Sequence, residues 1–205
     1  MKMNFKGLVN LHTLPKTAPL LPLYEAVINS IQSIEDAGIE NGKIEIKIER
    51  ENQMSLFEHW ETDIENIVIA DNGTGFNEEN YNSFDTYASE YKLQKGCKGV
   101  GRMMWLKAFN NVEVESIFID EGNKKCRKFL FDSKNAVHDM EIFRVENDTP
   151  KTTTIHLNGL RGEYKSNCPK KIETIAKNIL NHCFAYYVLG KAPKILVYDD
   201  HDTVD

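Results

Sequence analysis

Residues 71–76, Asp-Asn-Gly-Thr-Gly-Phe, have the clearest capacity for chemistry in this chain. They follow an apolar run, residues 67–70, that predicts a buried strand. A strand that ends in an acid and two closely spaced glycines brings a carboxylate to a fixed point and lets a ligand approach bare backbone. Asp, Asn and Gly also dominate ordinary turns, so the segment taken alone fits a plain turn better than a binding site.

An upstream stretch places an acid and an amide on one face of a predicted helix over residues 22–36. Glu25 and Asn29 are four residues apart, which stacks their side chains one turn apart. The apolar residues at helical spacing, which would face a core, are Leu23, Val27, Ile31 and Ile34. The simpler interpretation is an amphipathic helix whose polar face meets water.

A downstream stretch, residues 95–102, is rich in glycine and leads into a predicted helix over residues 100–109. Free backbone N–H groups at a helix start, the helix dipole and close-approach glycines favour bound phosphate. Lys98 and Arg102 add positive charge there. The loop lacks the Gly-Lys-Ser/Thr ending of a P-loop, and no strand directly precedes it as a dinucleotide fingerprint requires. Taken alone, this loop is weak evidence for a phosphate-binding site.

The order of the three stretches is more informative than any one of them. Glu-x-x-x-Asn on a helix, Asp-x-Gly-x-Gly after a strand, and Gly-x-x-Gly-x-Gly before a helix resemble the GHKL ATPases. That superfamily includes gyrase-type topoisomerases, heat-shock chaperones, mismatch-repair ATPases and histidine kinases. A fourth element fits, since residues 152–157 resemble the late strand that places a Thr beside the adenine. Alternation favours Thr153 for that role, with Thr152 as the second choice.

The resemblance implies a role for each matching residue. Asp71 would accept a hydrogen bond from the adenine amine, and Gly75 would let the base lie against backbone. Asn29 would hold Mg²⁺ through its side-chain oxygen, and Glu25 would orient a water as the catalytic general base. The residues that the resemblance assigns to nucleotide binding are Asn29, Asp71, Gly73, Gly75, Gly96, Lys98, Gly99, Val100, Gly101 and Thr153.

Glu25 decides between the reaction types of the superfamily. Members that hydrolyse ATP carry an acid at this place, whereas histidine kinases lack it, so hydrolysis is favoured over phosphotransfer to a histidine. Gln32 stands where hydrolysing relatives usually have Asp, which weakens a supporting charge and leaves the strength of nucleotide binding open. A regulatory module that binds nucleotide without turnover and an interaction domain that binds none are the alternatives.

The resemblance also predicts an organisation. We expect one ATP-binding domain over residues 1–205, the N-terminal part of a longer protein, with slow turnover in isolation. Residues 1–20 would be a dimerisation arm and residues 77–98 an ATP lid. The expected partners are ATP, a second copy in an ATP-dependent homodimer, and nucleic acid or a client protein through missing domains.

Composition narrows the class of protein. Hydrophobic residues make up 41% of the 205 residues and charged residues 27%, close to globular averages. No apolar run approaches the roughly 20 residues of a membrane helix, and the four cysteines lack metal-ligand spacing. We therefore expect a cytoplasmic protein with free thiols. A net charge of −6 argues against a strong DNA-binding surface, and the basic run at 124–128 is expected to be a solvated edge or a helix start.

Hydrophobic patterning predicts a mixed layout. The predicted strands are residues 43–49, 65–70, 112–119, 126–132, 152–157 and 194–199, and the predicted helices are residues 22–36, 100–109 and 169–187. Helices covering one face of a mixed, largely antiparallel sheet give an α+β two-layer sandwich. The resemblance implies the same architecture, the Bergerat ATP-binding fold.

Overall fold

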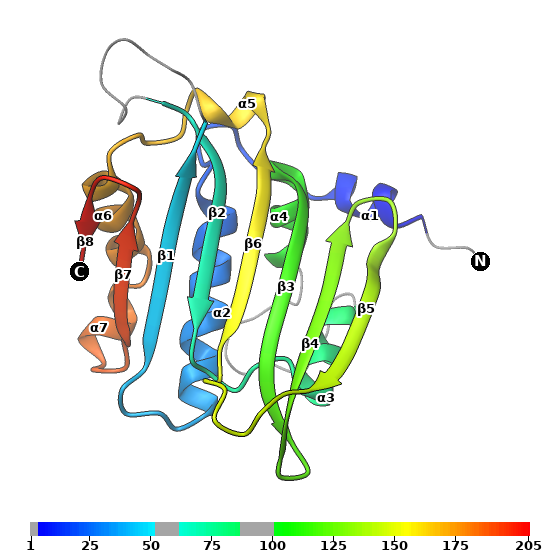
Figure 1. Ribbon diagram of the computed structural model, residues 1–205. Helices are drawn as coiled ribbons and strands as arrows, with labels where there is room; N and C mark the ends of the chain where they lie inside the picture. Colours follow the sequence, from blue (N-terminus) through cyan, green and yellow to red (C-terminus); the bar gives the residue numbers. More distant parts are fainter. Residues whose placement is uncertain (1–3, 52–61, 87–100) are drawn as a thin grey trace.

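The computed structural model describes residues 4–51, 62–86 and 101–205. They form an α+β fold built on one mixed sheet of eight strands (Figure 1). The strands are β1 (Lys43–Arg50), β2 (Ile64–Asp71), β3 (Phe109–Asp120), β4 (Asn123–Asp132), β5 (Ala136–Arg144), β6 (Thr153–Leu160), β7 (Lys194–Tyr198) and β8 (Thr203–Val204). The helices are α1 (Phe5–Leu11), α2 (Leu21–Asp36), α3 (Glu78–Asp85), α4 (Gly101–Ala108), α5 (Gly162–Lys165), α6 (Ile172–His182) and α7 (Phe184–Val188).

The strand order is β5-β4-β3-β6-β2-β1-β7-β8. Every neighbouring pair is antiparallel except β1 and β7, which are parallel. Strand β6 inserts between β2 and β3, although it follows both in the chain. This insertion brings the start of β6 beside the end of β2, the place where the Asp-x-Gly-x-Gly segment begins.

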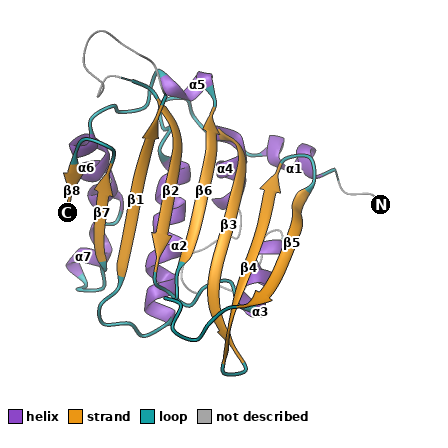
Figure 2. Ribbon diagram, viewed as in Figure 1, coloured by secondary structure: helices purple, strands orange, loops and turns teal. Residues whose placement is uncertain are grey.

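Helices α2, α4, α6 and α7 lie on one face of the sheet, behind it in the view of Figures 1 and 2. The apolar stripe predicted for α2 is buried there, which confirms that prediction: Leu23, Val27, Ile31 and Ile34. Strand β1 turns Ile44, Ile46 and Ile48 toward the same core, as its alternation predicts. The covered face of the sheet is therefore the core of the molecule.

The largest difference from the predicted layout is the helix expected over residues 169–187. It is two helices, α6 and α7, because the backbone at Cys183 leaves helical geometry (φ −94°, ψ 8°). The predicted layout also lacks β5, an edge strand whose side chains are mostly exposed and therefore show no buried alternation. The other elements absent from the predicted layout are short or polar: α1, α3, α5 and β8.

Over the described ranges, no helix combines the length and the apolar character that crossing a bilayer requires. The described cysteines, Cys126, Cys168 and Cys183, are buried free thiols, as expected. Burial raises the pKa of Cys168 to about 12 and that of Cys183 to about 11, so neither thiol is an activated nucleophile.

Candidate functional site

Four buried polar side chains form one row across the covered face of the sheet, here called the polar row. Asp71 on β2 lies opposite Thr153 on β6, Thr153 lies opposite Ser116 on β3, and Ser116 lies opposite Arg127 on β4. Their exposed fractions are 5% for Asp71, 4% for Thr153, 0% for Ser116 and 1% for Arg127.

Two residues further along the same strands, the equivalent row is wholly apolar: Ile69, Ile155, Val114 and Phe129. Burying polar groups costs free energy unless they are hydrogen-bonded, so a polar row at the end of an apolar face marks a specific role in structure or binding.

The carboxylate of Asp71 is held by donors from two elements. Ser30 on α2 donates its hydroxyl to Oδ2 of Asp71 at 2.8 Å, and the backbone N–H of Gly73 donates to Oδ1 at 2.8 Å. Hydrogen bonds to an ionised acceptor are the stronger kind, about 1.5–3 kcal/mol each. Helix α2 and the segment after β2, two of the three stretches identified in the sequence, are therefore joined at Asp71.

Gly73 and Gly75 let the turn after Asp71 lie flat against its neighbours. A Cβ on Gly73 would come within 2.7 Å of the Cβ of Ser33 on α2. Gly75 has φ +79°, and a Cβ there would meet the Ser116 hydroxyl at 2.8 Å. Packing within the chain thus already requires both glycines, independently of any ligand.

Thr153, rather than Thr152, is the threonine of the polar row. Its hydroxyl shares a 2.8 Å hydrogen bond with that of Ser116, which also accepts the backbone N–H of Phe76 at 2.8 Å. Thr152 precedes β6, and its carbonyl accepts the N–H of Ile117 at 2.8 Å. The alternation that favoured Thr153 agrees with this placement.

Arg127 corrects the expectation that residues 124–128 form a solvated edge. Its Nη1 donates to the carbonyls of Phe76 at 2.8 Å and Asn77 at 3.0 Å, and its Nη2 pairs with Glu78. The guanidinium also lies 4.5 Å from the ring centroid of Tyr81. Arg127 therefore fixes the chain where the glycine turn leads into α3.

Helix α3 forms part of the segment predicted to be the ATP lid, residues 77–98. The side chain of Asn77 caps it by accepting the N–H of Asn80 at 2.9 Å, and Phe84 packs on Phe129 and Phe131 of β4. Residues 87–98 of that predicted lid lie outside the described residues, so the lid stays a prediction.

The third stretch meets α2 at Glu25. Trp105 on α4 is buried and donates its indole N–H to the carbonyl of Pro22 at 3.0 Å, which docks α4 on the start of α2. A Cβ on Gly101 would collide with the carboxyl group of Glu25. Gly101 and Glu25 are thus in contact. Arg102, predicted to add positive charge to this loop, is buried and donates from Nη2 to the carbonyl of Thr86 at 2.8 Å. The residues of the loop that the resemblance assigns to nucleotide binding lie outside the described residues, except Gly101: Gly96, Lys98, Gly99 and Val100.

The two predicted site residues on α2, Glu25 and Asn29, have different environments. Glu25 is half-buried, and burial raises the pKa of its carboxyl group, with the nearby His182 partly offsetting that rise. Asn29, one turn later and directly before Ser30, is exposed. A carboxyl group with a raised pKa is a better proton acceptor than an ordinary glutamate once it is ionised.

Gln32 points away from Asp71, into the contact between α2 and α7. Its side chain is 1% exposed, and its Nε2 donates to the Tyr186 hydroxyl at 3.4 Å. The position at which the GHKL resemblance implies a charge is here part of a neutral interhelical contact.

Sequence reasoning missed Ser30, Ser116 and Arg127. The signal was present for two of them. Ser30 falls between Val27 and Ile31 in the buried stripe of α2, and Arg127 alternates in phase with the inward Phe129. Ser116 follows the inward alternation of β3, but nothing local relates it to Thr153 or to Phe76.

Comparison with protein-family models finds no match, and comparison with curated proteins finds no significantly similar sequence. The geometry of the described residues is therefore the basis for assigning a function.

Proposed function

We propose that this chain is an ATP·Mg²⁺-binding and ATP-hydrolysing domain with the two-layer Bergerat fold of the GHKL ATPases. One observation carries the proposal: α2 contacts both other motif stretches. Ser30 of α2 orients the Asp71 carboxylate, and Glu25 of the same helix touches Gly101. Residues that share a site must converge, and this convergence is what supports the proposal.

The polar row supports an adenine site. Asp71 is fixed by two donors with its carboxylate held in one orientation, as a selective acceptor for the adenine amine must be. A hydrogen bond from that amine to a carboxylate would contribute about 1.5–3 kcal/mol, enough to select adenine over a base without the donor. Thr153, directly opposite Asp71, would contribute its hydroxyl beside the base.

Asn29 would supply the protein ligand to Mg²⁺. Magnesium keeps most of its waters and takes only one or two protein ligands, with phosphate oxygens completing its shell. Over the described ranges, no group of three or more His, Cys, Asp and Glu side chains is arranged to hold a metal ion. The exposed amide of Asn29 fits a site completed by the nucleotide. The bound ion would neutralise phosphate charge.

Glu25 would orient the attacking water and accept its proton. It lies one helical turn before Asn29, so its carboxylate would lie near the phosphate end of a nucleotide whose base lies at Asp71. Gly101, the first residue of α4, sits against that carboxylate, so the phosphate loop would close over it.

A nucleotide-binding module without turnover is the second candidate. The buried contact between Gln32 and Tyr186 favours it, because the neutral amide supplies no supporting charge at the place where hydrolysing relatives have one.

ATP-linked dimerisation through residues 1–20 remains a prediction. In this structure, residues 4–20 pack on their own chain: Val9 and Leu14 are buried, and the ring of Phe5 lies 5.7 Å from that of Phe131. An arm that reaches a second copy would have to leave these contacts.

The first test is a thermal melt with and without Mg²⁺-ATP. We expect a stabilisation in the parent chain, about 2.7 kcal/mol at 100 times Kd, and none for Asp71→Asn. Ser30→Ala keeps the carboxylate but removes one of its donors, so it should retain a reduced shift. An unchanged shift in Asp71→Asn would refute the adenine site.

The second test is phosphate release. Glu25→Gln should abolish it, whereas Glu40→Gln, the same charge change at an exposed position, should not alter it. A parent chain that shows the melting shift without phosphate release would support the second candidate instead.

A further inference from the structure

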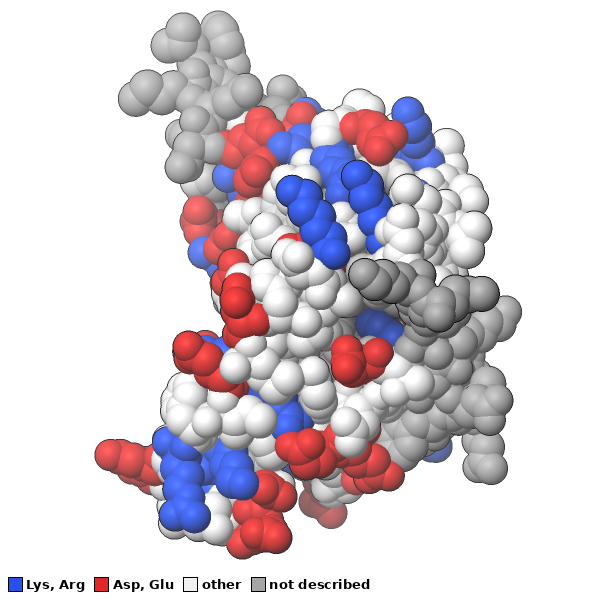
Figure 3. All heavy atoms as spheres, turned by 90° about the vertical axis from the view of Figure 1, so that its right-hand side faces the viewer, with Lys and Arg blue, Asp and Glu red and all other residues white. Residues whose placement is uncertain are grey.

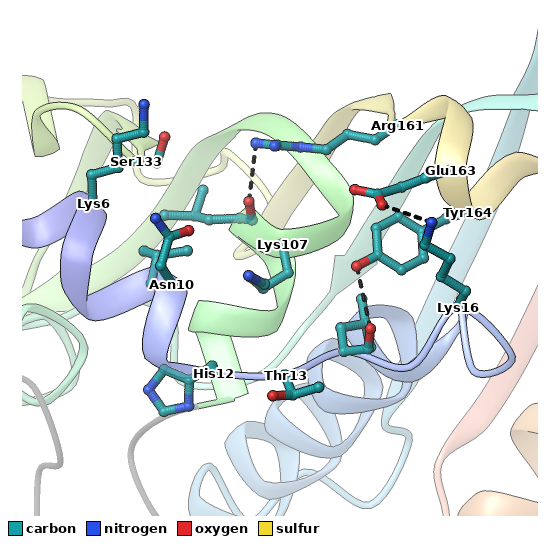
Figure 4. Close-up of a pocket in the computed structure, with 13 residues that line it drawn as sticks. Lys6, Asn10, His12, Thr13, Lys16, Lys107, Ser133, Arg161, Glu163 and Tyr164 are labelled. Atoms are coloured by element: carbon teal, nitrogen blue, oxygen red, sulfur yellow. Dashed lines mark hydrogen bonds and ion pairs between the residues drawn. The ribbon is translucent and has the colours of Figure 1, made fainter.

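A polar hollow lies at the end of α4 opposite Gly101 and Glu25. It is a pocket of about 400 Å³ between α1 and the segment that follows it, the last turn of α4, and the corner between β6 and α5 (Figure 4). We call it the N-terminal pocket. Its volume falls within the range of about 300–1,000 Å³ that is usual for small-molecule sites. Lys107 lies six positions after Gly101, about 9 Å along the helix axis, so this pocket is distinct from the proposed ATP site.

The charge of the N-terminal pocket is opposite to that of the chain. Four cationic residues line it, Lys6, Lys16, Lys107 and Arg161, against the single carboxylate of Glu163. The chain as a whole carries a net charge of −6. Figure 3, which views this side of the molecule, shows blue side chains gathered on its upper part. Like charges repel when they are brought together, so such a cluster favours an anionic ligand.

The positive charge of the pocket is only weakly offset by neighbouring carboxylates. Lys16 pairs with Glu163 at 3.4 Å, but both side chains are about half exposed, so the pair is weak. Arg161 donates to the carbonyls of Leu106 at 3.1 Å and Phe109 at 3.3 Å, which orients the guanidinium without neutralising it.

Lys6 and Lys107 provide the remaining charge. Within residues 4–51, 62–86 and 101–205, neither ammonium group has a carboxylate at ion-pair distance. Figure 4 shows them on different walls of the hollow, Lys6 on α1 and Lys107 on α4.

The walls of the pocket are fixed by contacts within the chain. Tyr164 donates its hydroxyl to the carbonyl of Leu14 at 3.3 Å, which ties the N-terminal segment to α5. The N–H of Arg161 donates to the carbonyl of Ala108 at 2.8 Å, which ties the β6–α5 corner to α4. Because the walls are tied, a ligand would have to order the lysine side chains but not the backbone that carries them.

We propose that the N-terminal pocket binds a small ligand that carries two or more phosphate groups. Lysine acts as a point-charge partner for phosphate, and Arg161 adds a planar donor. Asn10, Thr13 and Ser133 line the same hollow and offer neutral donors to phosphate oxygens. Cations on separate walls suit a ligand whose charge is spread over more than one phosphate.

Isothermal titration with inorganic tripolyphosphate tests this assignment. We expect the double variant Lys6→Gln/Lys107→Gln to bind at least tenfold more weakly than the parent chain. The matched control is Lys171→Gln/Lys177→Gln, which makes the same charge change on exposed positions at α6, near the opposite edge of the sheet from α1 (Figure 1). The control should bind like the parent, and affinity in both should fall as salt rises.

Two outcomes would overturn the proposal: equal affinity in the two double variants, or tighter binding of a short single-stranded DNA than of tripolyphosphate. Asn29→Ala separates this pocket from the ATP site, because Asn29 is the exposed residue proposed to hold Mg²⁺ at the phosphates there, and its loss should leave tripolyphosphate binding at Lys6 and Lys107 intact. Circular dichroism checks that the glutamine variants fold.

Discussion

Replacing Arg127 by Met tests the polar row most directly. Methionine keeps an unbranched apolar side chain beside the ring of Tyr81 but removes every donor of the guanidinium. The carbonyls of Phe76 and Asn77, which accept from Nη1 at 2.8 and 3.0 Å, then lose that partner. Glu78 loses an ion pair as well, but its side chain is 65% exposed and regains water.

The magnitude follows from those two carbonyls. A buried acceptor left without its partner costs about 1–3 kcal/mol, and the release of a buried guanidinium offsets part of the sum. We expect Arg127→Met to lower the free energy of unfolding by about 2–4 kcal/mol. At about 2–4 °C per kcal/mol for a chain of this size, Tm would fall by about 4–16 °C.

The neighbouring residue provides the control. Lys128 points to the opposite face of β4, is 43% exposed, and pairs with Glu115 at 2.8 Å. An exposed pair contributes about 0–1 kcal/mol, so Lys128→Met should change Tm little. Denaturant unfolding and thermal melts of both variants measure the difference. Equal effects of the two substitutions would refute the inward placement of Arg127 and, with it, the register of the polar row.

Three further predictions concern stability and pH. Burial opposes ionisation of Asp199, but the backbone N–H groups of His201 and Asp202 and the Arg50 guanidinium at 2.8 Å outweigh burial and lower its pKa. Asp199→Asn should therefore destabilise the chain at pH 7, and urea melts should show the deficit shrinking as the pH falls from about 4 through the lowered pKa. Burial raises the pKa of Glu25, so the ionised carboxylate lowers the free energy of unfolding above that pKa. Glu25→Gln should therefore melt no lower than the parent at pH 7, and a lower Tm would contradict the raised pKa. Gly75→Ala should cost about 1–3 kcal/mol because it combines φ +79° with a contact on the Ser116 hydroxyl, and an unchanged Tm would argue against that backbone conformation.

Much of the fold could be predicted because it depends on local periodicity. The apolar stripe of α2 and the alternation of β1 each identify an element and its buried face from a dozen or so residues. The edge strand β5 could not be found in this way, because its side chains are mostly exposed and it carries no apolar alternation. The break between α6 and α7 at Cys183 follows no Pro or Gly signal, so it too required the structure.

In the candidate site, too, only the residues that belong to local motifs could be predicted. The residue types and their order along the chain identified Glu25, Asn29, Asp71 and Gly101 as candidates, because each motif lies within a few consecutive residues. The residues that support them are contributed by distant strands, and no local pattern relates one strand to another.

By itself, the sequence determined which side chains are available for chemistry and which face of each element is apolar, because both follow from residue type and period. Only the tertiary structure decided that β6 lies between β2 and β3, which aligns Asp71, Thr153, Ser116 and Arg127 in one buried row. Strand order and register arise from long-range packing, in which the energy of a contact depends on residues far apart in the chain.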